Sequence, residues 1–278
     1  NEPNVHALLG HLAGVQAPGL SGLSDFLAAV HHQNLAVGEG VARLRELGSW
    51  PLGTVVNLQP IEAASSSEDD LAAAGLADEA FNRACLDPLL LGEYPPLLAP
   101  LMEVVAKAGD ERTLAQPLDF VGVNHYTVQR VRAGGGPVGV ELPPAPEGVE
   151  TTAIGWQVAP AAFVRQLLEV KERYGNPPVY VTENGAAYSD PAPARGAVAD
   201  PLRVNHLRRY LLALHEALAT GCDVRGYFVW TLVDNFEWAD GFTRRFGLVH
   251  LDRETLQRTP KGSFHFYAEV VASGSVPD

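Results

Sequence analysis

The sequence predicts an α/β fold in which parallel strands alternate with helices. Short β-branched segments recur along the chain, and segments with apolar residues at helical spacing separate them. Alternation of this kind favours a parallel sheet covered by helices. Each strand segment also ends in amide, carboxylate or aromatic residues, as expected where the carboxyl ends of parallel strands form a site.

The elements follow in order along the chain. Pro3 suits the first turn of a helix, and we expect a second helix between a cap at Ser24 or Asp25 and a stop at Gly48. The predicted helices cover residues 4–14, 24–47, the end of the 65–70 loop to about 86, 98–108, 160–174, 201–220 and 263–271. The predicted strands cover residues 53–58, 118–124, 179–181 and 224–230, with a short β-like piece at 247–251.

The connections are predicted from glycine, proline and polar residues. Asp87-Pro88 and Tyr94-Pro95-Pro96 indicate an irregular region, and residues 133–150 indicate a surface loop or ribbon. Further loops are expected at 186–200 and 231–245. No composition shift indicates a second domain, so residues 1–278 are interpreted as one domain.

Composition excludes several classes of function. The 278 residues are 46% hydrophobic and 19% charged, which is typical of a globular protein with a large core. A net charge of −13 disfavours nucleic acid and anionic membrane surfaces as partners. Only two cysteines occur, Cys85 and Cys222, which form neither a disulfide framework nor a metal-ligand cluster. The few cysteines favour a reducing compartment, and we expect a cytoplasmic location, no metal and no cofactor.

The most informative segment reads VYVTENG, from Val179 to Gly185. Its strand runs directly into Glu183, and Asn184-Gly185 then turns the chain. A single glutamate at a strand end is most often merely solvated. However, Glu2, in the opening Asn1-Glu2-Pro3, occupies an equivalent junction after a strand that the sequence does not contain. Two carboxylates at strand ends are what glycoside hydrolysis requires, because one protonates the leaving oxygen while the other attacks or activates water.

Further motifs make the chain resemble the C-terminal part of a glycoside hydrolase family 1 enzyme, a β-glucosidase or β-glycosidase. They are NEP at 1–3, APG at 17–19, NLQP at 57–60, DFVGVNHY at 119–126, GWQVAP at 155–160, VTENGAAY at 181–188, RGYFVWTLVDNFEWADGFTRRFGLVHLD at 225–252 and RTPK at 258–261. The resemblance covers nearly the whole sequence. It implies a (β/α)8 TIM barrel, of which this chain supplies roughly the second half, with four strands.

The resemblance also implies roles for the residues around the two carboxylates. Glu2 would be the general acid/base with a raised pKa, and Glu183 the nucleophile, which should stay ionised. Asn1 would bind the sugar 2-hydroxyl, and Tyr126 would donate its hydroxyl to Glu183. Asn124 would support the site or touch substrate.

A second group of implied residues would bind the sugar ring. Glu237 would accept hydrogen bonds from the 4- and 6-hydroxyls, while Trp230 and Trp238 would offer flat apolar faces. Phe246 would close the site from the side, and Trp156 would line the aglycone subsite. Without the resemblance, these tryptophans are equally consistent with an aromatic core cluster.

The resulting hypothesis is a retaining β-glycosidase that hydrolyses β-glucosides or related β-glycosides through a covalent glycosyl-enzyme. One alternative is a 6-phospho-β-glycosidase, although a carboxylate at Glu237 would repel a phosphate. Another alternative is a non-catalytic, sugar-binding half-barrel.

Four parallel strands leave edges that need a partner. We expect an N-terminal barrel half, apparently absent from the sequence, in the same or a separate polypeptide. The remaining option is that two copies of this chain associate.

Overall fold

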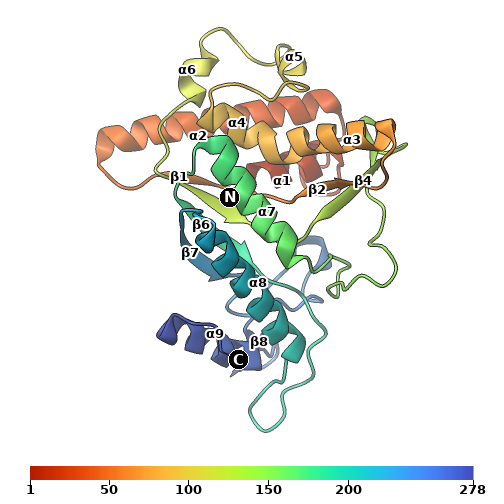
Figure 1. Ribbon diagram of the computed structural model, residues 1–278, viewed down its shortest axis with the longest axis vertical. Helices are drawn as coiled ribbons and strands as arrows, with labels where there is room; N and C mark the ends of the chain where they lie inside the picture. Colours follow the sequence, from red (N-terminus) through yellow and green to blue (C-terminus); the bar gives the residue numbers. More distant parts are fainter. Residues whose placement is uncertain (278) are drawn as a thin grey trace.

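The computed structural model describes residues 1–277, and its centre is a four-stranded parallel sheet (Figure 1). The strand order is β1-β3-β6-β7, so each strand lies beside the next one of the set along the chain. The strands are β1 (Gly53–Asn57), β3 (Phe120–Asn124), β6 (Val179–Asn184) and β7 (Val224–Val229). All four strands predicted for the sheet are confirmed.

Helices pack on one face of this sheet and form the main core. Val121, Val123 and Val181 are completely buried and cluster with Phe26 and Phe163 of the covering helices. Alternate residues along each strand point to the opposite face, since side chains in a strand alternate with a period of two. The helices that contribute to this core include α2 (Leu23–Leu47), α4 (Ala84–Leu90), α7 (Pro160–Tyr174) and α8 (Pro201–Ala219).

The four-stranded sheet is open, so it forms only part of a barrel. Among the described residues, β1 and β7 each pair with one neighbouring strand only. The backbone N–H of Glu2 donates to the Val55 carbonyl oxygen at 2.9 Å, so the start of the chain lies beside β1.

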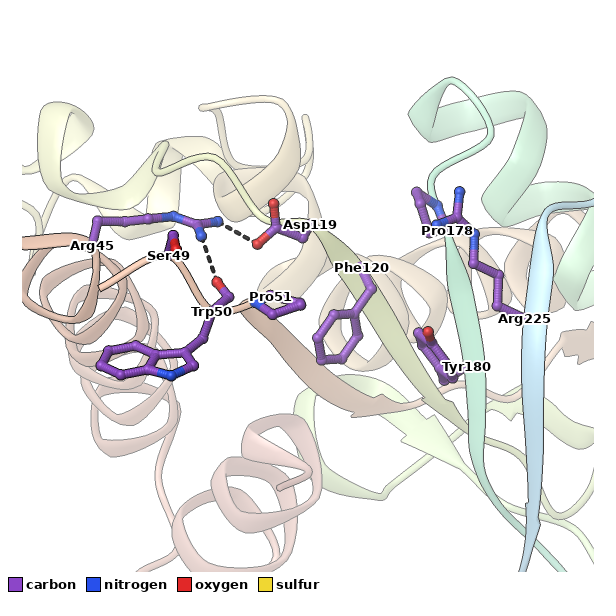
Figure 2. Close-up of a pocket in the computed structure, with 9 residues that line it drawn as sticks. All are labelled: Arg45, Ser49, Trp50, Pro51, Asp119, Phe120, Pro178, Tyr180 and Arg225. Atoms are coloured by element: carbon purple, nitrogen blue, oxygen red, sulfur yellow. Dashed lines mark hydrogen bonds and ion pairs between the residues drawn. The ribbon is translucent and has the colours of Figure 1, made fainter. Parts of the chain in front are cut away.

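At the strand starts, a hollow of about 280 Å³ includes Phe120 and Tyr180, whose ring centroids are 5.3 Å apart (Figure 2). Arg45 and Asp119, which pair with each other, also line this hollow, at the end of the sheet away from the strand termini that carry Asn57 and Asn124.

Two small sheets and several short helices complete the described chain. The first small sheet has the order β2-β4-β5, and β8 pairs with β9 in the second. Their bounds are β2 (Ile61–Ala63), β4 (Gln129–Ala133), β5 (Val140–Glu141), β8 (Val249–Leu251) and β9 (Arg258–Pro260). The other helical elements are α1 (Pro3–Ala7), η1 (Leu8–Leu12), α3 (Glu68–Asp78), η2 (Glu79–Arg83), α5 (Ala99–Met102), α6 (Asp110–Leu114), η3 (Pro137–Gly139), η4 (Trp238–Asp240) and α9 (Gly262–Ser273).

The expected irregular region begins after Leu90 and not at Asp87-Pro88, because both of these residues lie inside α4. Proline has no N–H to donate to the carbonyl four residues earlier, that of Ala84. Asn34 Nδ2 donates to this carbonyl oxygen instead, at 2.9 Å. A partner from another helix therefore compensates for the bond that the proline removes.

Two other expectations about helices also need correction. The cap of α2 is Gly22, without a side-chain hydrogen bond, and neither Ser24 nor Asp25 acts as the cap. The helix expected at 98–108 is limited to the single turn α5, which turns follow. In contrast, the cap of α3 is a side chain, since Ser67 accepts a hydrogen bond from the Asp70 N–H.

Within residues 1–277, no helix combines the length and the apolar character needed to cross a membrane.

Candidate active site

Strand register brings three polar residues to the same level at the carboxyl end of the sheet. Asn57, the last residue of β1, pairs with Asn124, the last residue of β3. Asn124 in turn is the register partner of Glu183 on β6, beyond an irregularity that follows Val123. Because the strands are parallel, their carboxyl ends share one edge, and these side chains meet there.

Two amides bridge the two candidate catalytic carboxylates. Asn124 Nδ2 lies 2.8 Å from Glu2 Oε1 and 3.2 Å from Asn1 Oδ1. Asn1 Nδ2 donates to Glu183 Oε1 at 3.4 Å. A second donor, Asn57 Nδ2, reaches Glu2 Oε1 at 2.9 Å. The structure thus brings Asn1, Glu2 and Glu183 together in one hydrogen-bonded group, although 181 positions separate the two glutamates.

The Glu183 carboxylate also accepts the hydroxyl of Tyr126, at an oxygen–oxygen distance of 2.5 Å. Burial raises the pKa of Glu183 above its ordinary value, while the hydrogen bond from Tyr126 opposes that shift and the nearby Glu2 charge adds to it. Burial and the Glu183 charge raise the pKa of Tyr126 well above its ordinary value. The phenol therefore remains a donor to Glu183 throughout the neutral pH range.

An aromatic cluster adjoins this group. The ring centroids of Tyr126 and Trp156 are 5.2 Å apart, and Phe246 lies 6.4 Å from Tyr126 and 6.1 Å from Trp156. Phe246 is only 1% exposed. Its ring therefore packs against Tyr126 and Trp156, and its role in closing the site from the side stays a prediction.

The polar and aromatic loop that follows β7 brings Trp230 to the same edge. The backbone N–H of Trp230 donates to the backbone carbonyl of Asn184, the residue after Glu183, at 2.9 Å. The Trp230 indole also donates to Glu237 Oε2 at 3.4 Å. Burial raises the pKa of Glu237, and hydrogen bonds from Trp230 and Asn235 lower it.

Trp238 follows Glu237 in η4, and 70% of its surface is exposed. Asn124 is completely buried, so its position favours support of the site over contact with substrate.

Sequence reasoning missed two residues that orient this group. Asn57 holds Glu2, and Thr182 donates its hydroxyl to Asn124 Oδ1 at 2.6 Å. The position of Asn57 at the end of a buried strand, in the NLQP segment, was a usable signal. Thr182 had no such signal, because its contact depends on the register between β3 and β6.

A partial β/α barrel with paired carboxylates and an aromatic, carboxylate-bearing loop at one rim has the features of a barrel glycosidase. Comparison with known proteins leads to the same class of protein. The model of glycosyl hydrolase family 1 matches residues 1–275. A beta-glucosidase of Agrobacterium sp. is 41% identical over 285 residues, which covers 99% of this chain and 61% of the relative.

Solved structures give the same result. A family 1 β-glucosidase from Thermotoga maritima matches with a TM-score of 0.93 at 35% identity, covering 100% of this chain and 63% of that structure. A psychrophilic beta-glucosidase from Micrococcus antarcticus matches with a TM-score of 0.92 at 40% identity, covering 98% and 64%. This chain belongs to glycosyl hydrolase family 1. It spans less than two thirds of the length of these relatives.

Proposed function

We propose that the site at the carboxyl ends of β1, β3 and β6 is that of a retaining β-glycosidase, with β-glucosides or related β-glycosides as substrates. The observation that carries this proposal is the pair of amides, Asn1 and Asn124, linking the carboxylates of Glu2 and Glu183. A retaining enzyme needs its two carboxyl groups about 5–5.5 Å apart. Carboxylates that share one short chain of hydrogen bonds are suited to that requirement.

In the first step, Glu183 attacks the anomeric carbon and Glu2 protonates the glycosidic oxygen. The bond between the anomeric carbon and the leaving oxygen breaks, and an ester bond to Glu183 forms. In the second step, Glu2 removes a proton from water, whose oxygen attacks the anomeric carbon and releases Glu183. Because acid and base functions alternate on Glu2, no metal or nucleotide cofactor is needed.

The hydrogen bonds around the nucleophile support this division of roles. The short hydrogen bond from Tyr126 stabilises the anionic form of Glu183 and aims one of its oxygens. Asn1 is exposed and adjoins Glu183, which suits binding of a sugar 2-hydroxyl. That contact would strengthen as positive charge develops on the sugar in the transition state.

The loop after β7 supplies the proposed sugar platform. Glu237 offers two acceptor oxygens for the 4- and 6-hydroxyls, and Trp230 and Trp238 offer apolar faces to the sugar C–H groups. Trp156 lines the aglycone side, where its ring contacts Tyr126. Phe246 and Asn124 act from below, by holding the residues that touch substrate.

Replacement of Glu183 tests the proposal. Glu183→Ala should lower the hydrolysis of p-nitrophenyl β-glucoside by at least about 10⁴-fold, because no nucleophile remains. Azide or formate should restore part of the activity by entering the vacated space. Undiminished hydrolysis by this variant would refute the assignment. Comparison with the 6-phosphorylated substrate distinguishes a 6-phospho-β-glycosidase, which we disfavour because Glu237 would repel the phosphate.

A second candidate is a non-catalytic sugar-binding protein. The observation that favours it is that β1 and β7 each pair with only one neighbouring strand in the described part of the sheet. Glucose binding measured by calorimetry, with no release of p-nitrophenol, would support this candidate.

An N-terminal barrel half, in the same or a separate chain, is the proposed partner at these edges, so that residues 1–278 form part of one barrel domain. Full activity from a preparation with a single denatured band of this chain's size would contradict that partner.

We further propose a cytoplasmic location, in keeping with two buried free thiols, Cys85 and Cys222. Cell fractionation tests this location.

A further inference from the structure

A completely buried lysine lies behind the loop that carries Glu237. Lys261 precedes α9 and has no exposed surface. Its ammonium nitrogen lies 2.6 Å from Asp190 Oδ2 and 2.9 Å from Asp234 Oδ1. Lysine is almost never fully buried without a partner, because removing its charge from water is costly. The two carboxylates compensate the buried positive charge of this ammonium.

One of these carboxylates connects the two ends of residues 231–246, the sugar-binding loop. Asp234 Oδ1 also accepts the N–H of Gly247 at 3.0 Å, and the Asp234 N–H donates to the Val249 carbonyl at 3.0 Å. The backbones are so close that a Cβ on Gly247 would lie 2.2 Å from the Asp234 nitrogen. The Lys261 N–H adds a bond to the Leu248 carbonyl at 2.9 Å.

A second buried cation extends the same network. Arg203, which is 1% exposed, donates to both oxygens of Asp190 at 3.0 Å and to the Arg245 carbonyl at 2.8 Å. Asp190 is thus shared by Arg203, which reaches the end of the loop, and Lys261, which reaches its beginning. The network connects α8, the start of α9 and both ends of the sugar-binding loop.

We propose that Lys261 is a positioning residue for the sugar-binding loop. Its ammonium holds Asp234, and Asp234 in turn fixes the position of Glu237, three residues further along the loop, relative to Glu183. Lys261 touches no substrate itself. The importance given to Glu237 rests on the proposed function, whereas the restraint on the loop is a property of the folded chain alone.

Hydrogen exchange tests the restraint without any substrate. In Lys261→Met, amide exchange in peptides from residues 231–246 should be at least about tenfold faster than in the parent, because local opening no longer separates a buried ion pair. Peptides that cover β3 and β6 should exchange at the parental rate. Equal acceleration of all peptides, or none in the loop, would overturn the proposal.

The matched control is Lys171→Met. Lys171 also fixes a backbone group, since its ammonium donates to the Thr220 carbonyl at 2.6 Å, but it lies on α7 outside the network. Exchange in the loop should be unchanged in this variant. If Lys261→Met does not fold, Asp234→Asn makes the same comparison, because it keeps the side-chain volume and an acceptor for the Gly247 N–H while removing the charge that Lys261 pairs with.

A substrate comparison separates positioning from a general structural role. A β-xyloside lacks the hydroxymethyl group that Glu237 is proposed to bind, so misplacement of Glu237 should harm β-glucosides more. For Lys261→Met we expect kcat/KM to fall at least about tenfold further on p-nitrophenyl β-glucoside than on the β-xyloside, which is a difference of about 1.4 kcal/mol.

Equal losses on both substrates would contradict a role through Glu237. An inactive parent would instead count against the proposed function and leave the exchange result standing as the test of the loop restraint.

Discussion

Asn124 is the residue at which the contacts of both candidate catalytic carboxylates meet. Its Oδ1 accepts the hydroxyl of Thr182 at 2.6 Å, so its amide nitrogen faces Glu2 and Asn1. A hydroxyl that donates to the carbonyl side of an amide fixes the orientation of that amide. Thr182 therefore decides which end of Asn124 points toward the carboxylates.

The raised pKa of Glu183 has a consequence for stability. Burial is its main cause, and it makes the folded chain hold the carboxyl proton more tightly than the unfolded chain does. The resulting stabilisation is present at pH values below the ordinary carboxyl pKa and is lost as the pH rises toward the folded pKa. Glu183→Gln, which does not ionise, should therefore gain stability relative to the parent between pH 4 and pH 7.

Urea unfolding of both proteins at the two pH values measures this gain. Other titrating groups are common to both proteins and cancel in the difference. A difference that is independent of pH, or that shrinks as the pH rises, would contradict the role assigned to burial.

At the level of single residues, the sequence was sufficient to indicate the two glutamates and Tyr126 as candidates. Their positions directly after predicted strands, together with family resemblance, carried that prediction. The strand-end position of Asn57 was a usable signal for a site residue, but its bond to Glu2, like the bond from Thr182 to Asn124, depends on how β1, β3 and β6 align. A shift of one residue in register would turn these side chains to the other face.

Among the elements, α4 and α7 are joined by one buried carboxylate. Asp87 is 2% exposed and accepts two hydrogen bonds from Arg173, at 2.9 and 2.7 Å, and one from Tyr174 at 2.7 Å. Asp87→Ala should lower the free energy of unfolding by about 1–3 kcal/mol, because it removes a buried acceptor and leaves the Tyr174 hydroxyl without its partner, while the Arg173 side chain is 31% exposed and can be solvated. Chemical denaturation measures the loss.

The control is Asp223→Ala, which breaks an exposed pair with Arg225 and should have little effect. Equal losses for the two variants would show that burial does not set the importance of Asp87.

The packing of α8 contains a histidine whose two ring nitrogens lack hydrogen-bond partners among the described residues. His206 is 1% exposed and stacks on Tyr210 at 4.4 Å between ring centroids. Burial lowers the pKa of His206 to about 3. The unfolded chain binds this proton more readily than the folded chain, so stability is lost as the pH falls from about 6.5 toward 3.

His206→Phe keeps an aromatic ring and removes the titration. Compared with the parent, it should gain about 2 kcal/mol in free energy of unfolding between pH 7.5 and pH 5. Denaturation curves at both pH values test this gain. A constant difference between the two proteins would mean that His206 does not contribute to acid sensitivity.

Prediction of elements from the sequence succeeded where apolar periodicity was strong and failed where tertiary partners decide. The strands β1, β3, β6 and β7 and the helices α7 and α8 follow directly from periodicity. Asp87-Pro88 was misjudged because Asn34 supplies the bond that the proline removes. The strands β2 and β9 were missed because segments of three residues carry no measurable period.

At the scale of the whole molecule, the two faces of the sheet differ. Val121, Val123 and Val181 of β3 and β6 are completely buried against the helices, whereas Phe228 on β7 is 56% exposed. The predicted strand-and-helix alternation accounts for the covered face. It does not determine what lies against the edges of β1 and β7, since backbone groups at a sheet edge accept any strand of suitable shape. The described residues therefore carry one rim of the proposed site, and their sheet does not close into a barrel.

The central claim is that Glu183 forms a covalent bond to the sugar. Incubation with a 2-deoxy-2-fluoro-β-glucosyl fluoride, followed by intact mass and peptide mapping, tests it most directly, because the fluorine slows breakdown of the ester. We predict one added 2-fluoroglucosyl group on the peptide that contains Glu183, and none in Glu183→Gln. An unlabelled chain, or a label on another carboxylate such as Glu237, would contradict the account.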